Sequence, residues 1–394
     1  MTITIAHLAD THLGYQQYGL IEREKDFYDS FENIIDDIID KNVDYVIHSG
    51  DLFEHSKPPI NALLCAQKGF LRLIENNIKI IVIAGNHDIV QKRETSIPQE
   101  LYKNENFTIL NHKNRVYEIN EDIVIAGIQF IRKSLEESVK QILYEIQEEV
   151  QGYKHKILML HGSTRKHFEL NPEFELDTIP EGFDYYAMGH LHKRILEKDF
   201  KGGILSYPGS TDIREKGEIS DYDSNGKGYN LLTIDDELKV EYVNIPLERK
   251  FIVESIKYPE LDNKLDELEY EIKNDILTKY EKKPVLLINV KEGDFDKSEV
   301  SEKVYDKLKD LSLIIKLTYN PDIIIHGPSG ENPKVRAEEL IIEHLKEFKD
   351  EKITNLGLDL YKTLSQKNTE EAEEISERFY KKYYYNIEGE KNDN

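Results

Sequence analysis

The sequence predicts a layered α/β fold with two sheets, followed by a smaller α/β module and C-terminal helices. Up to Leu160, apolar runs of strand length alternate with amphipathic helical patterns. After Gly189, short strands separated by glycine and proline turns predict a second sheet that packs on the first. From Phe251 onward, strand and helix patterns alternate again, which is typical of a separate small domain.

The elements of the first part are assigned from their apolar patterns. Five runs have the length and composition of buried strands: Ile3–Ala9, Tyr45–Ser49, Ile80–Ala84, Ile157–Leu160 and Tyr185–Met188. Helical patterns cover Glu24–Lys41, Pro59–Asn76 and Leu135–Glu149. Open sheets of this kind bind ligands beyond the carboxyl ends of their strands. The residues that follow each run are therefore candidates for a binding site.

The later part of the chain contains two further groups of elements. The small module is predicted to contain the strand Phe251–Ile256, the helix Leu261–Tyr280, the strand Val285–Val290, the helix Ser298–Asp310 and the strand Ser312–Thr318. A linker with glycine and proline at 327–333 follows. Two helical patterns, Pro333–Glu351 and Thr369–Tyr385, complete the chain, joined around Asn355–Gly357.

Composition limits the classes of protein that the chain can be. A net charge of −24 over 394 residues excludes a basic surface, so nucleic-acid binding would need a local positive site. Cys65 is the only cysteine, which excludes an intrachain disulfide and a cysteine zinc cluster. No apolar run is long enough for a membrane span, and no signal peptide is recognised. We therefore expect a soluble cytoplasmic protein with no membrane partner.

Polar clusters follow the five predicted strands. They are Asp10-Thr11-His12, Gly50-Asp51, Gly85-Asn86-His87, His161 and Gly189-His190-Leu191-His192. Because strand ends meet at one edge of a sheet, oxygen and nitrogen donors far apart in sequence can converge there. Together the clusters predict one two-metal site, and the separate origin of the donors favours a hydrolase over a structural metal clip.

The first two clusters provide the carboxylates. A carboxylate that bridges two cations must present both oxygens, and Asp51, held by the turn at Gly50, is the natural candidate. Asp10 and His12 stand two apart on an extended segment, so both can point to one metal ion.

The remaining clusters provide neutral donors. His190 and His192 repeat the spacing of two and can serve the two ions separately, while Asn86 offers a carbonyl oxygen and His161 an imidazole. Two carboxylates leave a local surplus of about two positive charges once two divalent ions are bound. That surplus is where a phosphate would bind, and two metals can activate a water for in-line attack.

His87 is predicted to stay outside the ligand set. It directly follows Asn86, and neighbouring loop residues rarely coordinate the same ion. An imidazole that titrates near neutrality suits charge stabilisation or protonation of the leaving oxygen. A single histidine beside an apolar strand is more often a core or surface residue, and this reading is kept for His7 and His48.

The five clusters resemble the ordered motifs of the calcineurin-like metallophosphoesterases. Within that superfamily, four extended motifs resemble those of the archaeal double-strand-break repair nucleases of the Mre11/SbcD family. They are Asp10-Thr11-His12-Leu13-Gly14-Tyr15, Gly50-Asp51-Leu52-Phe53, Gly85-Asn86-His87-Asp88 and Gly189-His190-Leu191-His192-Lys193-Arg194. The protein-phosphatase branch would have Asp-Arg-Gly after the second motif and glutamate after the third histidine, where this chain has Glu54-His55-Ser56 and Asp88.

The resemblance implies a fold and a set of ligands. The fold would be a two-sheet sandwich flanked by helices in residues 1–246, a capping domain that contacts DNA in 247–326, and a linker with partner-binding helices in 327–394. One manganese ion would be held by Asp10, His12, Asp51 and His192, and the other by Asp51, Asn86, His161 and His190, with magnesium as the alternative metal. His87 would be the catalytic histidine that binds no metal.

The resemblance also implies an activity and partners. The protein would be a 3′–5′ exonuclease on duplex ends and a single-strand endonuclease, acting on DNA double-strand breaks at the nucleoid. It would form a homodimer through the helices after Pro59 and near Leu101, with Leu63 the best single match. Its partner would be the coiled-coil ATPase Rad50/SbcC, since the chain has no Walker-type loop of its own.

Some positions depart from the family or carry weaker signals. Relatives often have histidine where Glu54 stands and glutamine where Gly162 stands, which leaves the surroundings of the ligands open. Lys193 and Arg194 are candidates for DNA backbone contacts, although two basic residues more often form a solvated turn.

Two other functions stay open at this stage. A phosphodiesterase of the same superfamily acting on small molecules would cleave a chromogenic phosphodiester and spare DNA ends. A non-catalytic DNA-tethering subunit would lack a ligand, and every expected ligand is present.

Overall fold

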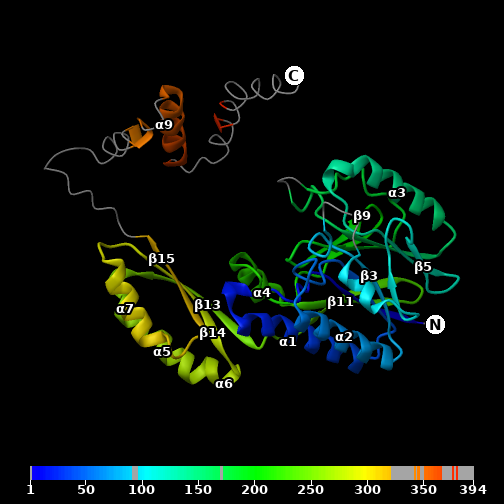
Figure 1. Ribbon diagram of the computed structural model, residues 1–394, viewed down its shortest axis with the longest axis horizontal. Coiled ribbons are helices and arrows are strands. Elements are labelled where there is room, and N and C mark those ends of the chain that lie inside the picture. Colours follow the sequence, from blue (N-terminus) through cyan, green and yellow to red (C-terminus); the bar gives the residue numbers. More distant parts are fainter. Residues whose placement is uncertain are drawn as a thin grey trace. The chain divides into compact units, whose positions relative to one another are not determined.

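The computed structural model describes residues 2–90, 96–168, 172–320, 341–342, 344–346, 350–365, 375–376 and 379. The chain divides into two compact units, and each is described by itself. The first unit comprises 1–255, 262–288 and 301–318, and the second 256–261, 289–300 and 319–394. The elements are labelled in Figure 1.

The strands are β1 Ile3–Leu8, β2 Tyr45–Ser49, β3 Lys79–Ile83, β4 Phe107–Ile109, β5 Val116–Glu118, β6 Ile123–Gly127, β7 His155–His161, β8 Tyr185–Gly189, β9 Ile195–Phe200, β10 Gly203–Tyr207, β11 Gly228–Ile234, β12 Leu238–Asn244, β13 Arg249–Lys257, β14 Lys282–Lys291 and β15 Ile314–Asn320. The α-helices are α1 Ile21–Asp40, α2 Ile60–Glu75, α3 Glu136–Glu149, α4 Ile219–Asn225, α5 Leu261–Glu271, α6 Leu277–Lys279, α7 Lys297–Leu308 and α9 Glu351–Ser365. A π-helical turn at Ile272–Ile276 joins α5 to α6.

Two six-stranded sheets form the main body of the first unit. One has the order β12-β11-β1-β2-β3-β4 and the other β5-β6-β7-β8-β10-β9. The prediction of a two-sheet α/β fold is confirmed, but the assumed division of strands at Gly189 is wrong. Strands β7 and β8 belong to the second sheet, where they pair in parallel, while β11 returns to pair antiparallel with β1.

Helices cover the outer faces of both sheets (Figure 1). Helices α1 and α2 pack on the first sheet through a cluster that includes Phe31, Phe70 and Phe107. Helix α3 packs on the second sheet through a cluster that includes Leu143 and Leu158. A third cluster joins the inner faces of the two sheets. The strands that carry the predicted site are therefore apolar on both faces, as the sequence indicates.

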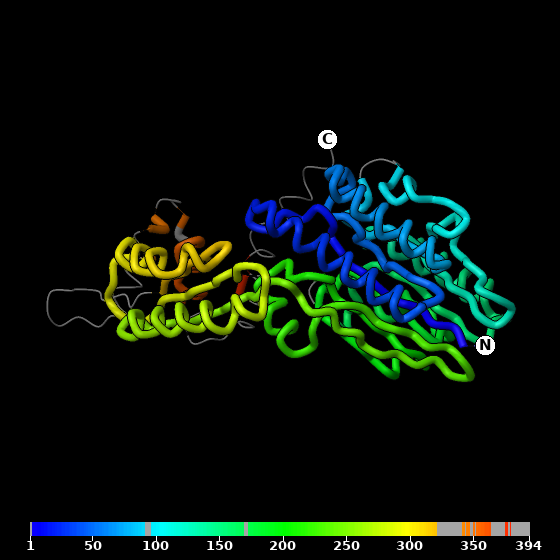
Figure 2. The backbone as a smooth tube through the Cα atoms, turned by 90° about the horizontal axis from the view of Figure 1, so that it is seen from below, coloured from blue at the N-terminus to red at the C-terminus, as the bar shows by residue number. Residues whose placement is uncertain are grey.

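Helices α1 and α2 lie side by side (Figure 2). Gly69 permits this close approach, because a Cβ atom there would lie 2.6 Å from the ring of Phe31. The pairs Lys68–Glu32 and Arg72–Asp36 link the solvent side of the same helices. Among the described residues, no helix is both long and apolar enough to cross a bilayer.

The predicted strand–helix order of the small module is present as β13, α5, β14, α7 and β15. The three strands form a sheet in the order β13-β14-β15. The domain limits 1–246, 247–326 and 327–394 stay a prediction. The linker at 327–333, most of the pattern Pro333–Glu351 and most of Thr369–Tyr385 lie outside the described residues.

The predicted join at Asn355–Gly357 is wrong, because helix α9 runs through it. Glycine in a helix costs only about 1 kcal/mol, so a single Gly does not end a helix that packs well elsewhere. A Cβ atom at Gly357 would lie 2.2 Å from the Leu345 side chain, so the glycine permits close packing within this unit.

A buried ionic cluster ties helix α1 to later parts of the first unit. The fully buried Arg23 contacts Asp26 on its own helix, and its guanidinium lies 2.7 Å from Asp212. Arg249, at the start of β13, lies 2.5 Å from Asp26. Ser30 donates to the second oxygen of Asp212 at 2.8 Å. The cluster fixes the segment 210–214, which borders the predicted site.

Removing one carboxylate of this cluster should destabilise the fold, because Asp26 alone then faces the buried guanidinium groups of Arg23 and Arg249. We expect Asp212→Asn to lower the free energy of unfolding of the metal-free protein by about 3 kcal/mol. Asp36→Asn removes a surface partner of Arg72 and should change it by less than about 1 kcal/mol. Urea unfolding followed by circular dichroism measures both, and equal effects would contradict a structural role for the buried cluster.

Candidate metal centre

The predicted clusters meet where the carboxyl ends of strands from both sheets come together. Strands β1, β2 and β3 carry the first three clusters, and β7 and β8 carry the last two. The two sheets touch at this edge, because the ring Nδ1 of His161 donates to the carbonyl oxygen of Ser49 at 2.8 Å. Asp10, His12, Asp51 and His161 are buried to 1% exposure or less.

Close approach and strained backbone accompany this convergence. A Cβ atom at Gly50 would lie 2.4 Å from the His161 ring, and one at Gly85 would lie 2.2 Å from an oxygen of Asp51. Glycine is therefore required at both positions. Asp10, His12 and Asp51 adopt left-handed backbone angles, with φ of 54°, 44° and 55°. Such strain in non-glycine residues persists where the surroundings fix it, and it concentrates at functional sites.

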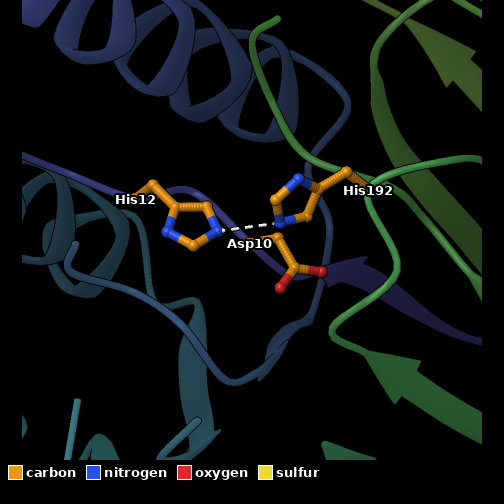
Figure 3. Close-up of side chains that lie close together, drawn as sticks. All are labelled: Asp10, His12 and His192. Carbon is orange, nitrogen blue, oxygen red and sulfur yellow. Dashed lines mark hydrogen bonds between the residues drawn. The ribbon is translucent and has the colours of Figure 1, made fainter. Parts of the chain in front are cut away.

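Asp10, His12 and His192 form one group of donors (Figure 3). The Nε2 atoms of His12 and His192 lie 3.1 Å apart. Their opposite Nδ1 atoms face carboxylates, at 2.9 Å from Glu54 for His12 and at 3.1 Å from Glu218 for His192. The carboxylate of Asp10 accepts the backbone N–H of His190 at 2.9 Å, which ties β1 to the loop after β8.

Asp51, Asn86, His161 and His190 form the second group. Nε2 of His161 lies 3.0 Å from the side-chain oxygen of Asn86 and 3.3 Å from Asp51. Nδ1 of His190 lies 3.0 Å from the same oxygen of Asn86. The second oxygen of Asp51 accepts the backbone N–H of His87 at 2.8 Å. All seven predicted ligands therefore lie in one cluster.

The donor set fits cations, because it places lone pairs opposite one another. A carboxylate beside one ring nitrogen favours the proton on that nitrogen, so Nε2 of a neutral His12 or His192 is a lone pair. Two such nitrogens 3.1 Å apart repel each other unless a proton or a cation lies between them. His161 faces acceptors at both ring nitrogens. The residues present thus suit two divalent metal ions.

In the metal-free chain, protons occupy the positions between the donor atoms that cations would take. Burial lowers the pKa of His12 to about 4. Burial also acts to lower the pKa of His192, but the hydrogen bond with Glu218 and the charge of Asp10 outweigh it and raise the value. Burial acts to lower the pKa of His161 too, but the charge and hydrogen bond of Asp51, with smaller contributions from Asp10 and Ser49, together raise it to about 9. Metal binding must therefore displace protons from the centre.

His87 lies beside these groups with a different environment. Its Nδ1 donates to the main-chain oxygen of Glu54 at 2.8 Å, and its ring packs edge-on against His12 with centroids 5.0 Å apart. Its side chain is 26% exposed, whereas those of His12 and His161 are fully buried. The donation by Nδ1 leaves Nε2 as the nitrogen that can meet a substrate.

Sequence reasoning missed Glu218, Lys227 and Arg214, and it named Glu54 only as a departure from the family pattern. Glu218 contacts His192 and is paired at 2.7 Å with the buried Lys227. Glu54 contacts His12 and is paired at 2.9 Å with Arg214. These partners lie far apart in sequence, so no local pattern identifies them.

Asp88 was noted only as a family marker, yet it organises the loops around the centre. Its buried carboxylate accepts backbone N–H groups of Leu52, Phe53 and Gly85, at 3.3, 3.0 and 2.9 Å. Gly162, the other departure from the family pattern, has a φ of 156° and lies against the ring of Phe174.

The two basic candidates for DNA contact differ in environment. Lys193 is exposed. Arg194 is 6% exposed and donates to the carbonyl oxygens of Pro208, Asn225 and Val243. The structure therefore gives Arg194 an internal role in place of the expected contact, because its guanidinium already holds the loop after β8.

The fold and donor set together define a class of protein. Residues 3–194, which contain all seven donors, match the family model described as calcineurin-like phosphoesterase. The class is that of metal-dependent phosphoesterases.

Comparison with curated proteins narrows the family. The chain is 36% identical to the DNA double-strand break repair protein Mre11 of Methanocaldococcus jannaschii, over 95% of this chain and 97% of that protein. It is 33% identical to Mre11 of Methanococcus maripaludis, over 96% and 99% of the two chains, and 30% identical to Mre11 of Saccharolobus solfataricus, over 96% and 98%. The chain belongs to the Mre11 family of DNA double-strand break repair proteins.

His7 and His48 lie in the core below the centre, as expected. His7 is fully buried between Tyr185 and Ser49, at 2.8 and 2.9 Å. Burial and the neighbouring charge of His48 lower the pKa of His7 to about 3, and burial lowers that of His48 to about 3.

These lowered pKa values predict acid sensitivity. Between about pH 6.5 and pH 3 the unfolded chain binds a proton at each position and the folded chain does not, so stability falls as pH falls. We expect His7→Gln to lower the slope of unfolding free energy against pH by about 1.4 kcal/mol per unit in this window. Denaturant unfolding of the metal-free protein measures the slope, and an unchanged slope would contradict a neutral buried His7.

Proposed function

We propose that the chain is a manganese-dependent DNA nuclease that processes double-strand breaks, with magnesium as the alternative metal. The observation that carries this proposal is the convergence of seven metal-type donors at the joint edge of two sheets, with His87 beside them. The relatives are named as DNA double-strand break repair proteins, which supports DNA as the substrate. We infer 3′–5′ exonuclease activity on duplex ends and endonuclease activity on single strands.

We assign the ligands as two sets that share one carboxylate. Asp10, His12, Asp51 and His192 would hold one ion, and Asp51, Asn86, His161 and His190 the other. When bound, the pair of ions supplies a nucleophilic water and binds the phosphoryl oxygens. Their charge exceeds that of the two carboxylates, which would attract a phosphodiester in spite of the net charge of −24.

His87 would act on the substrate directly. Its Nδ1 is fixed by the main-chain oxygen of Glu54, so Nε2 is presented on the more exposed side of the centre. A protonated Nε2 can donate to a phosphate oxygen and stabilise the charge that develops there, or protonate the leaving oxygen. Lys193, exposed next to His192, would contact the DNA backbone.

We assign the other parts of the chain by function as well. Residues 247–326 would be the capping domain that contacts DNA, and residues 327–394 would bind a coiled-coil ATPase of the Rad50/SbcC type. The length of the match to the Mre11 relatives supports a shared organisation over all three parts.

Substitution at the centre should separate metal binding from chemistry. We expect Asp51→Asn to lose bound Mn²⁺ and cleavage of linear duplex DNA together, because the bridging carboxylate serves both ions. His87→Ala should keep two Mn²⁺ ions by calorimetry while its turnover falls by about 10²- to 10⁴-fold. Labelled duplexes of both polarities give the rate and the direction of cleavage.

The same assay distinguishes the alternatives. Cleavage of a chromogenic phosphodiester with no cleavage of DNA would identify a phosphodiesterase for other substrates. DNA binding without any cleavage would identify a tethering subunit. Unchanged DNA cleavage in His87→Ala would overturn the role given to that histidine.

We also propose a homodimer through helix α2 and the turn Pro98–Tyr102. Leu63, the best match by resemblance, is half-buried against the core, and its carbonyl oxygen accepts the hydroxyl of Tyr102 at 2.9 Å. The exposed apolar residues are its neighbours Ile60, Leu64 and Leu101, at 73%, 55% and 69% exposure. Exposed apolar side chains on adjoining elements are typical of an interface.

A charge on this surface should disrupt the dimer. We expect Leu64→Asp combined with Leu101→Asp to convert a dimer to a monomer, measured by size-exclusion chromatography with light scattering. Leu135→Asp changes a similarly exposed leucine at the start of α3 and should leave the mass unchanged. A dimer that persists in the double variant would place the interface elsewhere.

A further inference from the structure

Glu54 makes contacts with three parts of the centre. Its side chain is 5% exposed and lies in the loop after β2. One carboxylate oxygen is 2.9 Å from Nδ1 of His12, and the other is 2.9 Å from a terminal nitrogen of Arg214. Its main-chain oxygen accepts Nδ1 of His87. One residue therefore touches a predicted ligand, the predicted catalytic histidine and a cation.

The contact with His12 fixes which ring nitrogen is available. The carboxylate oxygen 2.9 Å away can only accept, so its charge favours the neutral ring that carries its proton on Nδ1, although the two atoms are not aligned as a hydrogen bond. Nε2 then keeps its lone pair and points toward Nε2 of His192, 3.1 Å away. A carboxylate behind a ligating imidazole also raises its basicity and holds the ring in one orientation. Glu54 thus prepares His12 for a metal ion.

Arg214 stabilises the buried carboxylate of Glu54. An isolated carboxylate is costly to bury, and the guanidinium supplies the opposite charge. Arg214 also lies over the ring of Tyr15, with 5.0 Å from its central carbon to the ring centroid. It follows Asp212, which Arg23 and Ser30 hold, so its position is set by the buried ionic cluster.

The two functions of Glu54 use different atoms, and that separates them experimentally. The contact with His12 needs the carboxylate, whereas the hydrogen bond from His87 goes to the main chain. The carboxylate lies 3.7 Å from Nδ1 of His87, beyond hydrogen-bond distance. Glutamine at this position keeps the size of the side chain and the main-chain acceptor but loses the charge. Such a variant should perturb the metal ligand and leave the orientation of His87 intact.

We propose that Glu54, supported by Arg214, is a positioning residue for the metal ion bound by Asp10, His12, Asp51 and His192. The proposal rests on the ligand assignment of the proposed function and gives a role to a residue outside the assigned ligands, which lies in one donor group with His12 and His87. Glu54 acts through His12 and does not contact the substrate. It differs in this from His87, whose loss removes a group that acts on the reacting phosphate.

Calorimetric titration of the metal-stripped full chain with MnCl₂ tests the proposal. We expect Glu54→Gln to weaken one of the two binding events by about 10- to 100-fold and to leave the other unchanged. At stoichiometric Mn²⁺, the electron paramagnetic resonance signal of a coupled ion pair should give way to that of an isolated ion. DNA cleavage should recover as Mn²⁺ is raised, whereas His87→Ala stays slow at every concentration.

Two further variants keep the test decisive. Arg214→Gln should weaken the same binding event by a smaller factor in the wild-type background and have no further effect in Glu54→Gln, because it acts through that carboxylate. Glu149→Gln breaks the surface pair of Glu149 with Arg115, at 2.9 Å, and should bind Mn²⁺ as the wild type does. Circular dichroism in EDTA verifies folding, and Arg214→Gln carries the test if Glu54→Gln is unfolded.

The outcomes separate this inference from the proposed function. Unchanged affinities for both ions in Glu54→Gln, or additive effects of the two substitutions, would overturn the role of Glu54. Equal weakening of both ions would also overturn it, since a general distortion would then be the cause. If the wild type binds two ions but does not cut DNA, the nuclease assignment fails and the titrations still decide the role of Glu54.

Discussion

The contact between the Nε2 atoms of His12 and His192 is the constraint on which the site depends. Two imidazole lone pairs held 3.1 Å apart in a buried place repel each other, so the arrangement requires a positive charge between them. The contact arises because strands of two different sheets end at one edge, with glycine at Gly50, Gly85 and Gly189 where the chains approach closely. Packing of the apolar sheet faces stabilises the fold and offsets the backbone strain at the ligands.

The positions of the ligands were predictable because each follows an apolar run, and periodicity is a local property of the sequence. Membership of the sheets was not predictable in the same way. Strands β1 and β8 carry similar runs, but β1 pairs with β2 and β11, while β8 pairs with β7 and β10. Strand pairing depends on register between segments that are distant in the sequence. An apolar run therefore does not identify the sheet to which its strand belongs or the strand beside it.

The charged partners of the ligands illustrate a second limit. Glu54 and Arg214 are separated by 160 positions in the sequence. Each is a charged residue of a type that usually lies on the protein surface. A charged side chain is seldom buried unless it is paired, so its burial depends on a partner that the local sequence does not reveal. Arg194 shows the same effect. Its position beside a predicted ligand suggested an exposed contact with DNA, but its guanidinium donates to main-chain carbonyl oxygens. Gly357 is the converse case, where local chemistry predicted a break and tertiary packing retained the helix.

The pairing of each supporting carboxylate with a cation has a consequence for the charge of the site. If Glu54 and Glu218 stood alone behind His12 and His192, their two charges would cancel the positive surplus that two divalent ions leave over Asp10 and Asp51. Arg214 and Lys227 neutralise them at 2.9 and 2.7 Å. The imidazoles thereby gain the orientation and basicity that a carboxylate confers, and the attraction for a phosphodiester is retained. Of the other two histidines, His161 donates to the main-chain oxygen of Ser49. His190 lies 3.6 Å from the carboxylate of Glu173, which accepts the N–H and the hydroxyl of Ser163. The two ion positions are therefore electrostatically unequal, and that inequality is built from residues outside the ligand set.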